Sequence, residues 1–141
     1  MKTVFTALAA ASGCTAARWY LERSSRREVE CLGGWVRLKS LWNEGAAFGL
    51  PVPFPSLAAG VALGLTWSQR RRNPLGAGLI LGGGLSNLAE RVRYGRVYDY
   101  IQFPKAPVPL RRYVFNLADF SILAGGAALL ASRKKPYRRR R

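Results

Sequence analysis

Residues 114–132 read VFNLADFSILAGGAALLAS, an apolar run whose single charged side chain is Asp119. A membrane-spanning helix needs ~20 predominantly apolar residues, so this run predicts a transmembrane helix. Hydrocarbon cannot solvate charge, and a carboxylate beside or within such a helix is therefore costly and usually kept for a function. Asp119 is the first candidate functional residue.

Three further apolar blocks precede this run. The first is rich in alanine and is interrupted by Arg18, and the second opens with alternating prolines, so its regular helix should begin after Pro55. The third holds five glycines, which allow helices in a membrane to approach closely. These features predict an all-α membrane protein with four transmembrane helices in a single domain. The spans are residues 4–21, 50–68, 74–89 and 114–132 of a domain covering residues 1–141.

The polar segments between these blocks have a different character. Residues 35–39 and 97–101 alternate between apolar and polar side chains, which predicts short strands in a small extracytoplasmic β-rich loop region. Four spans place both termini on one side. The clusters at 70–72 and in the tail, 133–141, are basic and lack acids, which favours the cytoplasm for both termini.

Composition narrows the function classes. The formal net charge is +16, which would suit nucleic acid, but four membrane-like blocks in 141 residues favour contact with anionic lipid instead. There is no histidine, which excludes Ser-His and Cys-His catalysis. With two cysteines only, neither a disulfide framework nor a zinc site is expected.

Asp99 and Asp119 each lie beside an apolar stretch, and the whole chain holds only seven acidic residues. Two carboxylates a few Å apart cannot both ionise cheaply, so such a pair shares a proton. The ionised member can then take a proton from water while the other protonates the carbonyl oxygen of a peptide. The pair predicts a membrane aspartyl protease, with either aspartate as the proton carrier.

Three segments of the chain resemble signal peptidase II, the bacterial lipoprotein signal peptidase family. The first, NEGAAF at 43–48, is similar to the family's N-x-G-A-A-F. The second, SNLAERVRYGRVYDYI at 86–101, resembles G-N-x-x-D-R-x-x-x-G-x-V-x-D-F. The third, FNLADFSI at 115–122, matches F-N-x-A-D-x-x-I. Their order and their placement against the apolar blocks also agree with the family.

The chain departs from the family at several positions. Ser86 replaces a glycine, Glu90 replaces an aspartate, and Tyr100 replaces a phenylalanine. The family's D-Q-x-x-K segment after the first helix is missing, and Glu22-Arg23 is its nearest counterpart. Both aspartates of the pair are present. We expect Glu90 to support the site through an ion pair or hydrogen bond beside Arg91.

The resemblance implies a multi-pass protein of the bacterial inner membrane with its active site at the extracytoplasmic face. It would remove the signal peptide from diacylglyceryl-modified prolipoproteins, cutting before the lipidated cysteine, as a monomer without metal or other cofactor. The alternative is a non-catalytic lipoprotein- or lipid-binding protein of the same family. The implied catalytic pair is Asp99 and Asp119, and the substrate-binding or supporting residues are Asn43, Gly45, Asn87, Arg91, Asn116 and Ala118.

Overall fold

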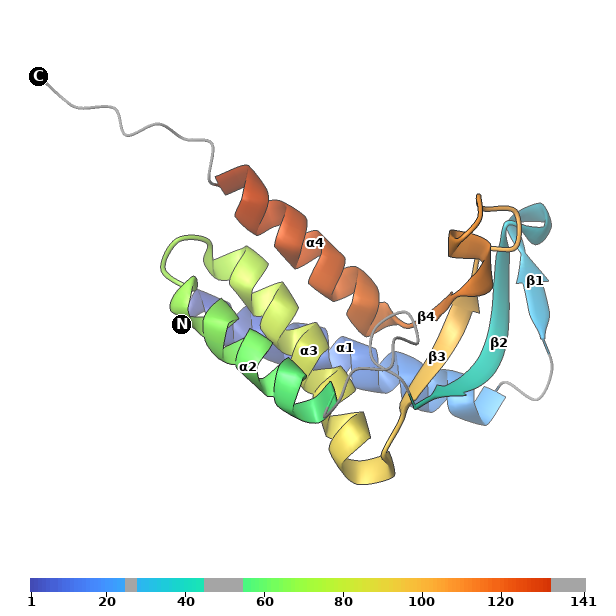
Figure 1. The fold of residues 1–141 in the computed structure, drawn as a ribbon, viewed down its shortest axis with the longest axis horizontal. Coiled ribbons are helices and arrows are strands. Elements are labelled where there is room, and N and C mark those ends of the chain that lie inside the picture. The colour runs from blue at the N-terminus through green and yellow to red at the C-terminus, as the bar shows by residue number, and fades with distance from the viewer. Residues whose placement is uncertain (25–27, 45–54, 133–141) are drawn as a thin grey trace, which may run out of the picture.

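The computed structural model describes residues 1–24, 28–44 and 55–132 (Figure 1). Four α-helices, four strands and two short 3-10 helices, Leu32–Gly34 and Leu110–Arg112, make up this part of the chain. In order, the α-helices and strands are α1 (Lys2–Ser24), β1 (Val29–Cys31), β2 (Val36–Asn43), α2 (Pro55–Ser68), α3 (Pro74–Tyr94), β3 (Val97–Gln102), β4 (Val114–Phe115) and α4 (Leu117–Ser132).

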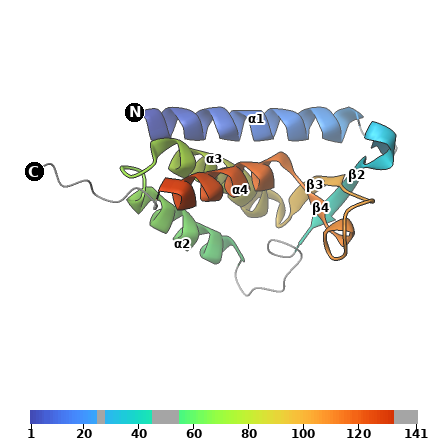
Figure 2. The same cartoon turned by 90° about the horizontal axis from the view of Figure 1, so that it is seen from above.

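Helix α3 is the centre of the helical bundle, because it packs against each of the other three helices. Figure 2 shows α1 along one side of α3 and α4, with α2 on the opposite side. The sequence sets both ends of α3. Its first turn is capped by the Asn73 side chain, which accepts from the Gly76 N–H at 2.9 Å, and Pro74 follows at the first helical position. It ends at Gly95, whose φ of +72° favours glycine.

Glycines set the spacing between these helices. A methyl group at Gly82 would lie 2.5 Å from the backbone oxygen of Ala7 on α1, and one at Gly83 would lie 2.6 Å from that of Ala118 on α4. Both distances are shorter than any ordinary carbon–oxygen contact. Helix α3 therefore holds α1 and α4 at a separation that only a missing side chain permits.

Two adjacent glycines of α4 should respond in opposite ways to the same substitution. A methyl group at Gly125 would lie 2.6 Å from the Gly76 backbone oxygen, whereas one at Gly126 would meet nothing within 4 Å. We expect Gly125→Ala to lower the free energy of unfolding by about 1–3 kcal/mol through overpacking. Gly126→Ala should be neutral or stabilise the helix by up to about 1 kcal/mol. Unfolding of both variants in detergent measures the difference, and equal stabilities would contradict this packing.

The four strands form one antiparallel sheet in the order β1-β2-β3-β4. Figure 1 shows the sheet at one end of the helical bundle, away from the N-terminus. Strand β3 is its most buried member, since residues 97–100 are all buried. It follows α3 and leads towards α4, so its side chains lie where the bundle meets the sheet.

The four helices, and strands β2 and β3, overlap segments predicted from the sequence, but several bounds differ and β1 and β4 were not predicted as strands. Helix α1 is longer than 4–21 and α3 extends five residues beyond 74–89, while residues 50–54 of the second block lie outside the described residues. The fourth helix begins three residues later than 114, because Val114 and Phe115 pair with β3. A four-stranded sheet also makes the class α plus β, where the sequence predicted an all-α protein with strands only in loops.

The predicted membrane spans are not confirmed by the helices themselves. Over the described ranges, none is both long enough and apolar enough for a bilayer crossing. Helices α2 and α4 have only 14 and 16 residues. Helices α1 and α3 are longer, but both carry charged side chains near their C-terminal ends.

Candidate active site

Asp99 lies on β3 and is only 3% exposed. It is paired across the sheet with Leu41, and Asn43 follows two residues later on the same face of β2. The side-chain amide of Asn43 donates to Asp99 Oδ2 at 3.0 Å, and that of Asn116 donates to Oδ1 at 2.7 Å. Both oxygens of this carboxylate are therefore held by amides from different elements.

Asp119 lies in the first turn of α4, and local backbone contacts fix its position. Its Oδ2 accepts from the Asn116 N–H at 2.9 Å, while Asn116 Oδ1 accepts from the Asp119 N–H at 3.0 Å. This reciprocal pair resembles a capping box, in which two side chains satisfy the free amides that begin a helix. The second oxygen, Oδ1, accepts from the amide of Asn87 on α3 at 3.2 Å.

Asn116 connects the two aspartates through one side chain. Its Nδ2 donates to Asp99 Oδ1 and, at 3.2 Å, to Asn87 Oδ1, while its Oδ1 caps the helix at Asp119. The residue is 5% exposed. Buried polar networks are costly when incomplete, and here every named oxygen of the pair accepts at least one hydrogen bond. The two carboxylates are thus held in one rigid cluster.

Burial raises the pKa of Asp99 from its ordinary 3.8 to about 6. Hydrogen bonds from Asn43 and Asn116 oppose the shift, whereas the nearby charges of Asp119 and Glu90 add to it. A carboxyl group with a pKa near 6 is partly protonated close to neutral pH. Asp99 can therefore exchange a proton in the range where acid–base catalysis operates.

The raised pKa of Asp99 should make protein stability depend on pH. Between about pH 4 and 6 the folded state binds this proton and the unfolded state has lost it, so stability should fall as pH rises through that window. Above pH 6, the free energy of unfolding would be lower than it is below pH 4 by about 3 kcal/mol in total. Denaturant unfolding across this range should show the slope in the parent protein and a smaller one in Asp99→Asn. Parallel curves for the two proteins would contradict the shift.

Tyr100 was noted in the sequence only as a replacement for phenylalanine, yet its hydroxyl has a position in this site. The oxygen accepts from the Leu117 N–H at 3.0 Å, at the start of α4. Burial raises the pKa of Tyr100 to about 12, so the hydroxyl stays protonated. Through this hydroxyl, which phenylalanine lacks, Tyr100 on β3 holds the first turn of α4. Tyr100 directly follows Asp99 in the chain.

The remaining predicted residues have different positions. Glu90 makes both kinds of contact that were expected of it: its Oε2 accepts from the Tyr98 N–H at 2.8 Å, and its Oε1 lies 3.8 Å from Arg18 Nε. Arg91 has a buried Nη1 without a hydrogen-bond partner in the described part of the chain, and its charge interacts with both aspartates. Ala118 is buried against α3. Gly45 lies outside the described residues.

Three phenylalanine rings form a cluster beside the pair. Phe103, Phe115 and Phe120 have ring centroids 6.0 to 6.1 Å apart. As for metal ligands, no three acidic or cysteine side chains gather as a cation would need in the ranges that the structure describes.

A pair of amide-held aspartates, of which Asp99 is buried and Asp119 partly buried, lies where a four-helix bundle meets a small sheet and defines a two-carboxylate site. The family described as Signal peptidase (SPase) II matches residues 7–133. The chain therefore belongs to the signal peptidase II family.

Several curated relatives share the name lipoprotein signal peptidase. That of Chlorobaculum tepidum is 30% identical over 134 residues, covering 84% of this chain and 83% of the relative. That of Syntrophomonas wolfei is 40% identical over 121 residues, covering 79% of this chain and 74% of the relative. That of Nitrobacter hamburgensis is 41% identical over 103 residues, with 63% of each covered. The chain thus spans somewhat under two thirds of the length of this last relative.

Solved structures share the fold. One, described as a bacterial membrane enzyme structure by the in meso method at 2.3 Å resolution, superposes with a TM-score of 0.80. The alignment covers 98% of this chain and 94% of that one at 18% identity. A second, of the same description at 1.9 Å resolution, has a TM-score of 0.79. These structures support the arrangement of helices and sheet described above.

Proposed function

We propose that this chain is a membrane aspartic endopeptidase. It removes the signal peptide from diacylglyceryl-modified prolipoproteins and cuts before the lipidated cysteine. The observation that carries the proposal is the buried cluster in which Asn116 links Asp99 to Asp119. Membership of the signal peptidase II family and the relatives' shared name support the same reaction and substrate class.

The proposed reaction uses the two carboxylates in opposite protonation states. The ionised one takes a proton from a water molecule, whose oxygen attacks the carbonyl carbon before the lipidated cysteine. The protonated one donates to the carbonyl oxygen, and a proton then passes to the leaving amine as the carbon–nitrogen bond breaks. The amides of Asn43, Asn87 and Asn116 hold both carboxylates in place, so little reorganisation accompanies the step.

Arg91 is the proposed contact for the substrate backbone. Its Nη1 is buried and has no hydrogen-bond partner among the described residues, and its charge lies near both aspartates. Leaving a buried donor unpaired is costly, so a substrate carbonyl oxygen at this position would be favoured. Gly45 and Ala118 are further proposed supporting residues, Gly45 from its motif alone.

We propose a location in the bacterial inner membrane, as a single domain. Large apolar side chains on all four helices face outward, among them Phe5, Leu8, Leu65, Leu123 and Leu130. An apolar surface of this kind is unusual for a protein in water and suits lipid. The membrane enzymes with the same fold support this location. Anionic lipids are the proposed partners of the basic clusters, and the protein acts as a monomer.

The decisive experiment is incubation of the purified protein in detergent with a diacylglyceryl prolipoprotein, followed on a gel. We expect a shift to the mature lipoprotein, and no shift with the same precursor lacking the diacylglyceryl group. Chelators should leave the rate unchanged, because the proposed step involves no metal. Binding of the precursor without any cleavage would instead support the lipoprotein-binding alternative.

The proposed orientation predicts a labelling pattern. With both termini cytoplasmic, β1 is extracytoplasmic, and Cys31 on it is partly exposed while Cys14 is buried. A membrane-impermeant maleimide added to sealed cells should therefore label the parent protein but not Cys31→Ser. A cysteine introduced as Tyr137→Cys in the Cys31→Ser background should be labelled only after lysis. Labelling of that cysteine in sealed cells would reverse the orientation.

A further inference from the structure

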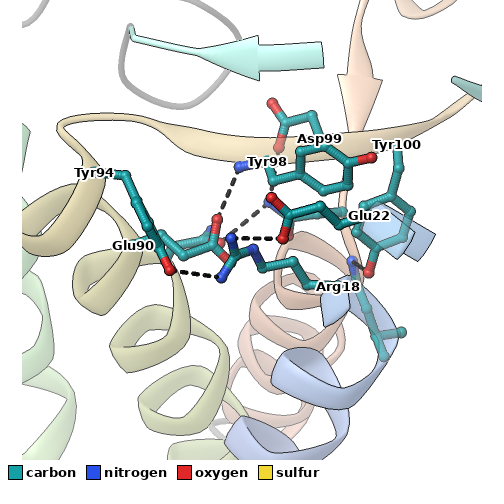
Figure 3. Close-up of polar contacts among 10 residues, drawn as sticks. Arg18, Glu22, Glu90, Tyr94, Tyr98, Asp99 and Tyr100 are labelled. Carbon is teal, nitrogen blue, oxygen red and sulfur yellow. Dashed lines mark hydrogen bonds and ion pairs between the residues drawn. The ribbon is translucent and has the colours of Figure 1, made fainter. Parts of the chain in front are cut away.

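A second polar cluster adjoins the aspartate pair on the side of α1. Arg18 extends from α1 towards α3, and its Nη2 donates to Glu22 Oε2 at 2.8 Å, one turn later on the same helix. Its Nε lies 3.8 Å from Glu90 Oε1, and its Nη1 is 3.5 Å from the Tyr94 hydroxyl. Figure 3 shows this guanidinium between the two glutamates, with Tyr94 beside it.

Glu90 connects this cluster to the strand that carries Asp99. Its Oε2 accepts from the backbone N–H of Tyr98, the residue directly before Asp99 (Figure 3). Strand β4 pairs with Ile101 and Gln102, and no other strand of the described residues lies on that side of the first half of β3. The Glu90 carboxylate thus provides the acceptor that a longer neighbouring strand would otherwise supply.

Several contacts place Arg18 beside Glu90. Its side chain is 15% exposed and that of Glu90 is 11% exposed, so water screens their attraction poorly. The guanidinium stacks over the ring of Tyr94 at 4.7 Å and lies 5.6 Å from that of Trp42 on β2. Removing one member of a buried ion pair leaves the other charge uncompensated, which would loosen the Glu90 side chain.

The cluster also accounts for two departures from the family pattern. The D-Q-x-x-K segment has an acid four residues before a base, whereas α1 has a base, Arg18, four residues before an acid, Glu22. On α3 the pattern has aspartate where this chain has Glu90, whose extra methylene lengthens its reach. The two departures are in contact with each other, because Glu90 on α3 accepts from the Tyr98 N–H and also lies beside Arg18 on α1.

We infer that Arg18 is a positioning residue for the reaction: through Glu90 it holds the Tyr98 amide, and with it the backbone that presents Asp99 to the substrate. The catalytic meaning of this inference rests on the proposed function, whereas the structural link from Arg18 to Tyr98 does not. Displacement of a reacting group by about 1 Å can cost about 100-fold in rate, so a group that acts only through position can have a large effect.

The test compares two arginines of the same helix. Arg18→Met keeps an unbranched chain against Tyr94 and removes the charge. Arg23→Met is the matched control, since Arg23 is exposed and stacks on Trp19, with no contact to Glu90 among the described interactions. Hydrogen exchange of the Tyr98 amide should be about tenfold faster in Arg18→Met and unchanged in Arg23→Met. In the cleavage assay Arg18→Met should lose about 10- to 100-fold in kcat with little change in KM.

A double variant shows whether Arg18 acts through Glu90. Glu90→Gln keeps an oxygen for the Tyr98 N–H but has no charge for Arg18 to hold. In that background Arg18→Met should change neither Tyr98 exchange nor kcat further, whereas independent roles would give additive effects. The double variant also leaves no unpaired buried charge, so it decides the question even where Arg18→Met alone fails to fold.

The outcomes separate this inference from the proposed function. Equal Tyr98 exchange in Arg18→Met and Arg23→Met, or additive losses in the double variant, would overturn the role of Arg18. Absence of prolipoprotein cleavage by the parent protein would overturn the proposed function, while faster Tyr98 exchange in Arg18→Met would still establish the link to β3.

Discussion

Asp99→Asn and Asp119→Asn should each abolish prolipoprotein cleavage, and the double variant should be no less active than either single one. The reaction needs one carboxyl group to accept a proton and the other to donate one, so a single remaining carboxyl group cannot do both. Residues that act as a unit show such non-additivity, and the loss of one costs nearly as much as the loss of all. Cleavage rates of the three variants in detergent measure this directly.

The control for these variants is Glu30→Gln. Glu30 is an exposed acid on β1 that pairs with Arg37 at 2.8 Å. Strand β1 is separated from β3, which carries Asp99, by β2. Glu30→Gln changes a carboxylate to an amide, as the Asp→Asn variants do. It should cleave at the parent rate. Near-normal cleavage by a folded Asp99→Asn or Asp119→Asn protein would end the aspartic-protease interpretation and favour the lipoprotein-binding alternative.

Asn116→Ala should have the second-largest effect, a loss of about 100- to 1,000-fold in the cleavage rate. The substitution removes the donor to Asp99 and the link to Asn87, and preorganised donors of this kind typically contribute that much. It also removes the acceptor for the Asp119 N–H, so stability should fall by about 1 kcal/mol as a helix cap is lost. Cleavage rates and unfolding in detergent, measured together, give both numbers.

Asn116→Asp separates these two contributions. An aspartate keeps an oxygen that can cap the helix, but its ionised form cannot donate to Asp99 and adds a further negative charge to the cluster. We therefore expect this variant to keep the cap and still lose cleavage. If Asn116→Asp were active and Asn116→Ala inactive, the cleavage rate would follow helix stability. That result would show that Asn116 acts only as a cap.

The sequence alone located the four helices, though not all of their ends, because helix signals are local. Apolar runs and the proline at 74 indicate where helices run, and each acts within a few residues, but the third helix was expected to end at 89 and continues to Tyr94, before Gly95. The strand-like alternation at 35–39 and 97–101 also indicated β2 and β3. The start of α4 was missed, because pairing of Val114 and Phe115 with β3 depends on a strand more than ten residues away.

The polar side chains that meet around the aspartates were also anticipated, through the resemblance of three segments to signal peptidase II. Their partners could not be deduced in the same way. Asn43 and Asp99 are 56 positions apart, and Asn87 and Asp119 are 32 apart, so only the packing of the sheet onto the bundle brings their atoms together. Glu90 was expected to make an ion pair or a hydrogen bond, but the sequence did not say that its partners would be Arg18 and the Tyr98 amide.

Arg18 shows most clearly what only the tertiary structure decided. In the sequence it is an interruption of an alanine-rich block, and its i,i+4 spacing to Glu22 predicts no more than a local ion pair. The glycines of α3 bring α1 close enough for the guanidinium to approach Glu90, and Glu90 in turn reaches the amide before Asp99. Helix formation follows from local pattern, but the partners of a buried charge depend on which helix packs beside it.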